Sequence, residues 1–303
     1  MKMAIENFAE SVLEKLKEVL EGIYVVSSVS VMKNNDVLLH GIQIKHRDKN
    51  IAPIMYLDEL FKQEVTVNDA VQWVLNTLYN SQADDIDTTD LVKYENVKSR
   101  IRGKLINYEL NKEYLQDKIY VKFLDLAVVF CIQVHLDIDN TENAVIVINR
   151  SLFSVWDINE AQLFEVAKEN MSKYEEYSFT SMFDVLLALQ QNSQVAACDI
   201  EDYPESCGLY VLSNKQKVVG ASVILNPNVL KEVSEILQDD LVLLPSSIHE
   251  WLVLKKSEAN TVGDIQELYE MVKAVNDNEV AHEDLLSYNV YTYNRETDRM
   301  YIL

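Results

Sequence analysis

The spacing of apolar residues alternates along the chain between a helical and a strand period, and it predicts most of the secondary structure. Residues 4–20 place apolar side chains three or four positions apart, which is typical of one face of an amphipathic helix. Residues 23–32 alternate like a half-buried strand, the polar segment Lys33–Asp36 predicts a turn, and residues 37–45 predict the returning strand. A second amphipathic helix is expected over residues 67–78.

The rest of the chain continues with both periods. Further helices are predicted over residues 94–102, 158–171, 179–189, 227–237 and 261–275. Further strands are predicted over residues 105–110, 123–136, 209–212, 221–225, 241–244, 251–254, 288–293 and 299–303. Two polar, acidic segments, 81–90 and 190–207, show no sustained period and are expected to be connectors.

One residue pattern occurs three times and predicts a repeated junction between a strand and a helix. Each copy has an alanine, four further strand residues, three polar or turn-like positions, and two apolar residues that open a helix. The copies are Ala52–Phe61, Ala144–Phe153 and Ala221–Leu230, and a strand and a turn precede each of them. Internal repeats decide architecture, although any hairpin followed by a helix gives a similar pattern by composition alone.

These elements predict an α/β (mixed α+β) fold of three related β-hairpin–helix modules, with largely antiparallel sheets covered by helices. We expect the modules at residues 1–85, 91–195 and 205–303, the second and third packed more closely together than with the first. A chain of 303 residues is long enough to bury a sizeable core.

The net charge of −22 bears on which partners are possible. It disfavours binding to nucleic-acid phosphates, which requires lysine and arginine to displace counterions, and it disfavours anionic membrane surfaces. The acidity suits solubility in a cytoplasm. The alternative is an acidic decoy that occupies the basic groove of a nucleic-acid-binding protein, but the acidic residues are dispersed rather than ordered in rows.

Three further features narrow the class of protein. No two of the six glycines lie close enough to form a phosphate-binding loop, so we expect no nucleotide cofactor. Three cysteines do not suggest a disulfide framework. The first residues lack the features of a signal peptide, and the longest apolar run, 126–136, is too short to span a membrane. A cytoplasmic location is the simplest expectation.

The loop Pro245–Glu250 is the strongest candidate for chemistry. Ser246, Ser247, His249 and Glu250 are the residue types that a nucleophile, its base and an orienting carboxylate require. However, triads are usually assembled from separate segments, and the G-x-S-x-G elbow is not present. A hairpin turn capped by short polar side chains explains the same residues and is the interpretation we favour.

Metal sites have weaker signals. The segment Asp137–Glu142 begins like a calcium loop but lacks the glycine at its sixth position and an acid at its twelfth, so a solvated turn fits better. The remaining candidates are scattered: His40, His46, His135, His249, His282, Cys131, Cys198 and Cys207. None of them has the spacing of a zinc site, so we expect no bound metal.

One short segment is basic. It contains Lys93, Lys98, Arg100, Arg102 and Lys104. It predicts either a contact with phosphate or an acidic partner, or an internal counter-charge for neighbouring acidic faces, and the second explanation is the simpler one.

Several motifs together resemble a family of uncharacterised proteins, classed as a domain of unknown function, from gut-dwelling anaerobic Gram-positive bacteria. They are Lys33–Asp36, Lys104–Tyr108, Phe123–Val129, Tyr210–Lys215 and Leu244–Glu250. The resemblance runs nearly end to end. In addition, Asp240–Leu254 and Ile265–Val275 are similar to the YtpQ-like proteins of bacilli. Neither family implies an activity, ligand or catalytic residue, so the resemblance implies one family unit in a bacterial cytoplasm.

The sequence therefore favours a non-catalytic binding or regulatory module that holds a protein partner, without a cofactor and without direct contact to nucleic acid or membrane. Two alternatives remain. One is a hydrolase-like enzyme that uses the Pro245–Glu250 loop, and the other is the acidic decoy described above.

Overall fold

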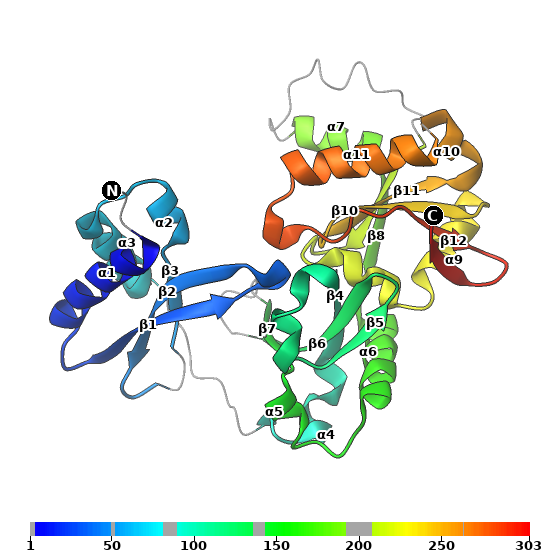
Figure 1. The fold of residues 1–303 in the computed structure, drawn as a ribbon. Coiled ribbons are helices and arrows are strands. Elements are labelled where there is room, and N and C mark those ends of the chain that lie inside the picture. The colour runs from blue at the N-terminus through cyan, green and yellow to red at the C-terminus, as the bar shows by residue number, and fades with distance from the viewer. Residues whose placement is uncertain (1–3, 50–51, 81–89, 136–142, 192–207, 263) are drawn as a thin grey trace.

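The computed structural model describes residues 4–49, 52–80, 90–135, 143–191, 208–262 and 264–303. It confirms the predicted mixed α+β class, because helices flank three antiparallel sheets of three, four and six strands (Figure 1). In the part that is described, no helix is long and apolar enough to cross a membrane.

The N-terminal part contains a three-stranded sheet in the order β1-β2-β3 with helices on one face. Its elements are α1 (Ile5–Val19), β1 (Tyr24–Met32), η1 (Asn34–Asp36), β2 (Leu38–His46), β3 (Ile54–Tyr56), α2 (Asp58–Lys62) and α3 (Val67–Asn80). Val12 and Leu16 of α1 and Val74 of α3 are fully buried against Ile42 and Ile44 of β2. The helices and the hairpin predicted from the periods are confirmed here.

The middle part is built around the long strand β6, which pairs with β4 on one side and with β5 and β7 on the other. Its elements are α4 (Tyr94–Val97), η3 (Lys98–Arg100), β4 (Ile101–Asn107), η4 (Glu109–Asn111), η5 (Tyr114–Asp117), β5 (Tyr120–Phe123), β6 (Leu126–His135), β7 (Asn143–Val147), α5 (Arg150–Phe153) and α6 (Glu160–Tyr174). Ile101 and Leu105 of β4 join the main core with α6, so Arg102 and Lys104 lie on the opposite face of the sheet.

The C-terminal part forms a six-stranded sheet in the order β13-β12-β10-β11-β9-β8. Its elements are β8 (Tyr177–Ser181), α7 (Met182–Gln191), β9 (Tyr210–Asn214), η6 (Gly220–Leu225), α9 (Val229–Leu237), β10 (Leu241–Ser247), β11 (Glu250–Lys255), α10 (Lys256–Val262), α11 (Ile265–Asn278), η7 (His282–Asp284), β12 (Tyr291–Asn294) and β13 (Arg299–Ile302). Leu243, Trp251 and Tyr291 on one face of this sheet share a continuous core with Ile101 and Leu105.

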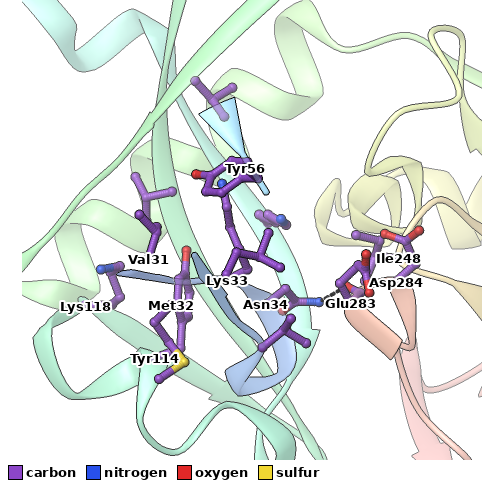
Figure 2. Close-up of a pocket in the computed structure, with 15 residues that line it drawn as sticks. Val31, Met32, Lys33, Asn34, Tyr56, Tyr114, Lys118, Ile248, Glu283 and Asp284 are labelled. Carbon is purple, nitrogen blue, oxygen red and sulfur yellow. Dashed lines mark hydrogen bonds between the residues drawn. The ribbon is translucent and has the colours of Figure 1, made fainter. Parts of the chain in front are cut away.

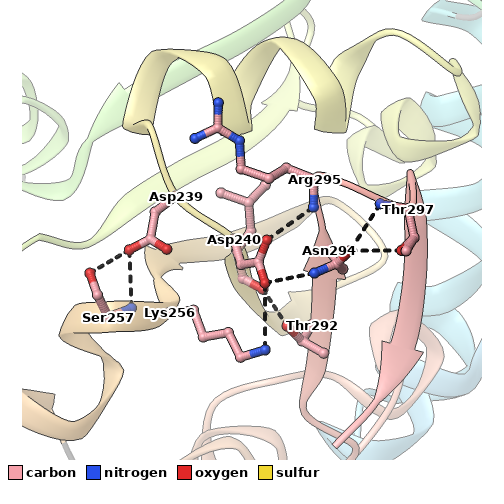
Figure 3. A network of polar contacts seen from close by, with 9 residues as sticks. Asp239, Asp240, Lys256, Ser257, Thr292, Asn294, Arg295 and Thr297 are labelled. Carbon is pink, nitrogen blue, oxygen red and sulfur yellow. Dashed lines mark hydrogen bonds and ion pairs between the residues drawn. The ribbon is translucent and has the colours of Figure 1, made fainter.

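Asp240 fastens the closing hairpin β12–β13 to the end of β10 (Figure 3). Its carboxylate accepts hydrogen bonds from the backbone N–H of Arg295 and from the Asn294 amide, both at 3.0 Å, and lies 3.6 Å from the Lys256 ammonium. The N–H of Arg295 is the main reason why the pKa of Asp240 lies below its usual value. The contacts of Asp240 therefore hold the end of β12 beside the start of β10, where the pairing between the two strands stops.

The third copy of the predicted repeat is wrong. Ala52–Phe61 and Ala144–Phe153 do pass from a strand into a short helix, but residues 221–225 belong to the 3₁₀ helix η6 and not to a strand. The chain enters η6 through Val219 in a left-handed conformation (φ 53°). Hydrogen bonds other than those of a β-ladder then satisfy the polar groups of η6. Trp251 Nε1 donates to the Ala221 carbonyl at 2.8 Å, and the Ser222 hydroxyl accepts from the backbone N–H of Leu105. Three equivalent modules are therefore not confirmed.

Four predicted boundaries need smaller corrections. The strand expected at 105–110 begins at Ile101, and the long strand expected at 123–136 is divided, because Leu124 adopts a left-handed turn between β5 and β6. Residues 179–181 belong to β8 rather than to a helix, and the helix expected at 261–275 is two helices, α10 and α11.

The predicted domain boundaries at 85–91 and 195–205 lie mostly outside the described residues and stay a prediction. β8, on one side of the second boundary, pairs along its whole length with β9 on the other. This pairing and the shared core join the middle and C-terminal parts closely.

Candidate functional site

A cavity of about 650 Å³ lies where the N-terminal hairpin meets the other two parts (Figure 2). We call it the interface cavity. It is lined by Val31, Met32, Lys33, Asn34, Val37, Leu39, Tyr56, Lys104, Tyr114, Lys118, Val145, Val147, Ile248, Glu283 and Asp284. Its volume lies in the range of about 300–1,000 Å³ that is usual for ligand sites.

The register of the N-terminal sheet explains its apolar wall. Strand residues alternate between faces, and the even-numbered Val26, Ile42 and Ile44 face the helices. Val31 pairs with Leu39, and Tyr56 pairs with Gly41, so these side chains project from the opposite, uncovered face. This face of the sheet forms one side of the interface cavity, and β7 contributes the other.

Asn35, at the tip of the β1–β2 hairpin, fixes the hairpin to the rest of the chain. It has a left-handed conformation (φ 57°), is 4% exposed, and donates through its amide to the carbonyls of His282 and Leu285 at 2.6 and 2.8 Å. Asn111 completes the contact, because its amide donates to Asn35 Oδ1 and its Oδ1 accepts from Asn35 N, both at 2.7 Å. Every polar group of the Asn35 side chain is therefore used across the interface.

The residues on either side of Asn35 extend this contact. Asn34 donates to the carbonyl of Glu283 at 2.6 Å (Figure 2). Asp36 accepts from the backbone N–H groups of Glu113 and Tyr114 at 3.0 and 2.7 Å. The tip thus binds both η5 and η7, which fixes the walls of the interface cavity in relation to one another.

Three lysines give the cavity a basic character within an acidic chain. Lys33 lies over the Tyr56 ring at 4.6 Å, and Lys118 forms an ion pair with Asp117 at 2.6 Å. Lys104 extends from β4, and burial lowers the pKa of its ammonium. The acidic side of the cavity is formed by η7, from which Glu283 and Asp284 come.

The predicted loop Pro245–Glu250 borders this cavity but does not assemble a serine nucleophile with its base. Ser246 and Ser247 end β10, and Glu250, opposite Ser247, begins β11. The Ser247 hydroxyl accepts from the backbone N–H of His249 at 3.0 Å, so the two residues meet through the turn and not through the imidazole.

Both imidazole nitrogens of His249 have other partners. Nδ1 accepts from the backbone N–H of Val219 at 3.0 Å, and Nε2 lies 3.4 Å from the carboxylate of Asp284. A general base needs a free nitrogen next to the hydroxyl that it deprotonates. The close approach depends on Gly220, where a Cβ would lie 2.6 Å from the His249 carbonyl oxygen. The arrangement holds the turn against η6 and η7.

In a comparison with known families, residues 5–295 match a family of unknown function, DUF5688. The chain belongs to DUF5688. No curated protein and no solved structure matches it. The membership confirms the family-level resemblance seen in the motifs, whereas the bacterial host and the likeness to YtpQ-like proteins stay predictions.

The other candidate residues of this DUF5688 protein do not converge on a metal site. Among the described residues, no three histidine, cysteine, aspartate or glutamate side chains could hold an ion together. Asp137–Glu142, Cys198 and Cys207 lie outside the described residues. Cys131 is a buried free thiol, and burial raises its pKa to about 11.

Sequence reasoning missed the residues that complete the interface. Asp284 and Asn111 lie 35 and 76 positions from the residues that they contact, and each stands in an ordinary polar stretch. For Asn35, the sequence offers only the asparagine-rich segment Lys33–Asp36, which predicts a turn but not its contacts. The basic segment did contain Lys104, for which a contact with an anion was one of two explanations.

Proposed function

We propose that this DUF5688 protein is a non-catalytic binding or regulatory module of the bacterial cytoplasm, and that its interface cavity receives a segment of a protein partner. The segment would carry apolar and acidic side chains. The observation that carries this proposal is the lining of the cavity, in which the uncovered sheet residues Val31, Leu39 and Tyr56 stand beside the ammonium groups of Lys33 and Lys118.

Charge complementarity supports an acidic partner. A chain of net charge −22 repels other acidic proteins over most of its surface. The lysines of the interface cavity are therefore a local exception that would orient an acidic segment and favour it over other partners. The valine, leucine and tyrosine side chains would supply the apolar contact.

The states of His249 and Cys131, the two side chains near the cavities that could take part in catalysis, support a non-catalytic role. His249 uses both ring nitrogens to hold its turn. The thiol of Cys131 is protonated at neutral pH, since its pKa of about 11 lies far above 7. A thiol in that state is neither a nucleophile nor a metal ligand.

Affinity capture with charge-reversed variants tests the proposal. The Lys33→Glu/Lys118→Glu variant should lose its partner by at least about tenfold, which corresponds to about 1.4 kcal/mol. Lys231→Glu, an exposed change on α9, is the matched control and should retain the partner. Equal capture by the wild type and by both variants would refute the proposed site.

A further inference from the structure

A second cavity of about 210 Å³, which we call the inner cavity, shares Lys104 and Val145 with the interface cavity. It is formed where one face of the four-stranded sheet meets Glu175 and the β9–η6 connection. It is lined by Arg102, Gly103, Lys104, Cys131, Gln133, Val145, Tyr174, Glu175, Asn214, Gln216, Val218, Val219 and Ser222. The strand pairs Arg102–Cys131 and Gln133–Val145 place those four side chains on the same sheet face.

Lys104 is the exceptional group of this cavity. Its ammonium forms no hydrogen bond or ion pair with any residue in the described ranges, although the side chain is half-buried. Lys98 of the same basic segment, by contrast, pairs with Glu95, and Lys168 pairs with Glu165. Removing a cation from water without a paired counter-ion is costly, and the more distant carboxylate of Asp284 does not offset that cost, because the pKa of Lys104 is still lowered. An anion in the inner cavity would remove that cost.

Arg102 adds a second cation on the same strand face. Its Nη1 donates to the carbonyls of Ser99 and Ile101, both at 2.9 Å, and its guanidinium lies 5.4 Å from the centre of the Tyr174 ring. These contacts hold the guanidinium in place without neutralising it, since no carboxylate of the described residues forms an ion pair with it. An arginine fixed in this way is prepared to bind an oxyanion.

Glu175 is the acidic residue of the inner cavity, and it forms no ion pair with Arg102 or Lys104 among the described residues. Burial raises the pKa of its carboxyl, and its Oε2 is buried with no hydrogen-bond partner among the described residues. The raised pKa brings the neutral form of this carboxyl within easier reach, and in that form the group donates a hydrogen bond to an anion. The inner cavity thus combines two cations with an acid whose unused oxygen is available to a ligand.

We propose that the inner cavity binds a small oxyanion, a carboxylate or a phosphate, through Lys104 and Arg102. At about 30 Å³ for each water, the volume is that of about seven water molecules, and it is below the roughly 300 Å³ that larger ligands need. A small metabolite or ion fits this volume. The site shares Lys104 with the interface cavity, but Arg102 lines only the inner cavity, and the Lys33→Glu/Lys118→Glu variant leaves the inner cavity unchanged.

Titration calorimetry with inorganic phosphate, acetate, pyruvate and succinate tests the site and identifies the class of anion. The wild type should bind at least one probe with 1:1 stoichiometry. Lys104→Gln should weaken that binding at least about tenfold, whereas Lys231→Gln should leave it unchanged. Absence of binding for all four probes, or equal affinity in Lys104→Gln and wild type, would overturn the proposal.

Labelling of the wild-type protein with a trace of acetic anhydride tests, without a mutation, whether the anion binds at Lys104. The bound probe should reduce acetylation of Lys104 at least about tenfold, and acetylation of Lys231 should not change. A probe that binds without protecting Lys104 would place the anion elsewhere and would also refute the site.

Discussion

Replacing Asn35 by alanine should release the N-terminal part from the rest of the chain without unfolding it. The side chain forms three hydrogen bonds across the interface, to His282, Leu285 and Asn111. Each contributes a net stabilisation of about 0.5–1.5 kcal/mol. Alanine in the left-handed conformation of residue 35 costs about 1–2 kcal/mol more. A loss of about 3 kcal/mol or more is therefore expected, which is roughly a hundredfold change in the docking equilibrium.

Hydrogen exchange of the backbone amides of Glu113 and Tyr114 measures this equilibrium, because both donate to Asp36 across the interface. In Asn35→Ala these two amides should exchange about a hundredfold faster. Amides inside the β1–β2 ladder should keep their protection, since the core around Ile42 and Ile44 is untouched.

Two further variants separate the contribution of the hydrogen bonds from that of the left-handed backbone. Asn35→Gly loses the same hydrogen bonds but tolerates the left-handed backbone, so its effect should be smaller by about 1–2 kcal/mol. Asn278→Ala removes only a local, exposed hydrogen bond to the Ala274 carbonyl and should change nothing at the interface. Unchanged exchange at residues 113 and 114 in Asn35→Ala, or equal loss along the whole β1–β2 ladder, would contradict the reasoning.

Three other predictions concern single side chains. Tyr291→Phe removes the 2.6 Å hydrogen bond to Asp125 and should lower the free energy of unfolding in urea by about 1.5–3 kcal/mol; an unchanged value would show that the bond contributes nothing. Cys131 should react with iodoacetamide at least roughly a hundredfold more slowly in the folded chain than in urea, as peptide mass spectrometry would show, because its pKa rises from 9.0 to about 11. Asp240→Asn should destabilise the protein at pH 7, and the difference from the wild type should shrink as the pH falls below about 4. The folded-state pKa of Asp240 is lowered from 3.8, so its stabilisation is present above that value and is lost as the pH falls through the folded-state pKa; a difference that is constant with pH would refute this origin.

The sequence predicts the N-terminal part well because its periods are simple. The helix face containing Val12 and Leu16 and the alternating strand around Val26 need no information from distant residues. The same holds for the β10–β11 pair, although its turn is tighter than the loop that was expected.

The misses have identifiable physical causes. Residues 221–225 are apolar except for Ser222, and such a short run does not distinguish a buried strand from a buried 3₁₀ helix. The break at Leu124 depends on a left-handed residue that is not glycine, and nothing in its neighbours announces it. Both depend on tertiary contacts rather than on local preference.

The candidate site could be predicted only in part. The basic segment was visible, but its role depends on where the strand begins. Because β4 starts at Ile101, Lys98 lies outside the sheet and pairs with Glu95, while Lys104 lies on a buried face and forms no ion pair among the described residues. The interface around Asn35 joins segments far apart along the chain, which periodicity does not report.

Site-specific photo-crosslinking in the native host tests the central claim, that the interface cavity receives a protein partner, most directly. A photoreactive residue in place of Val145, which is 53% exposed and lines the cavity, should crosslink one protein. The same residue in place of Val19, which is 59% exposed on α1, should not crosslink that protein. Absence of a crosslinked protein at position 145, or the same product at both positions, would contradict the account.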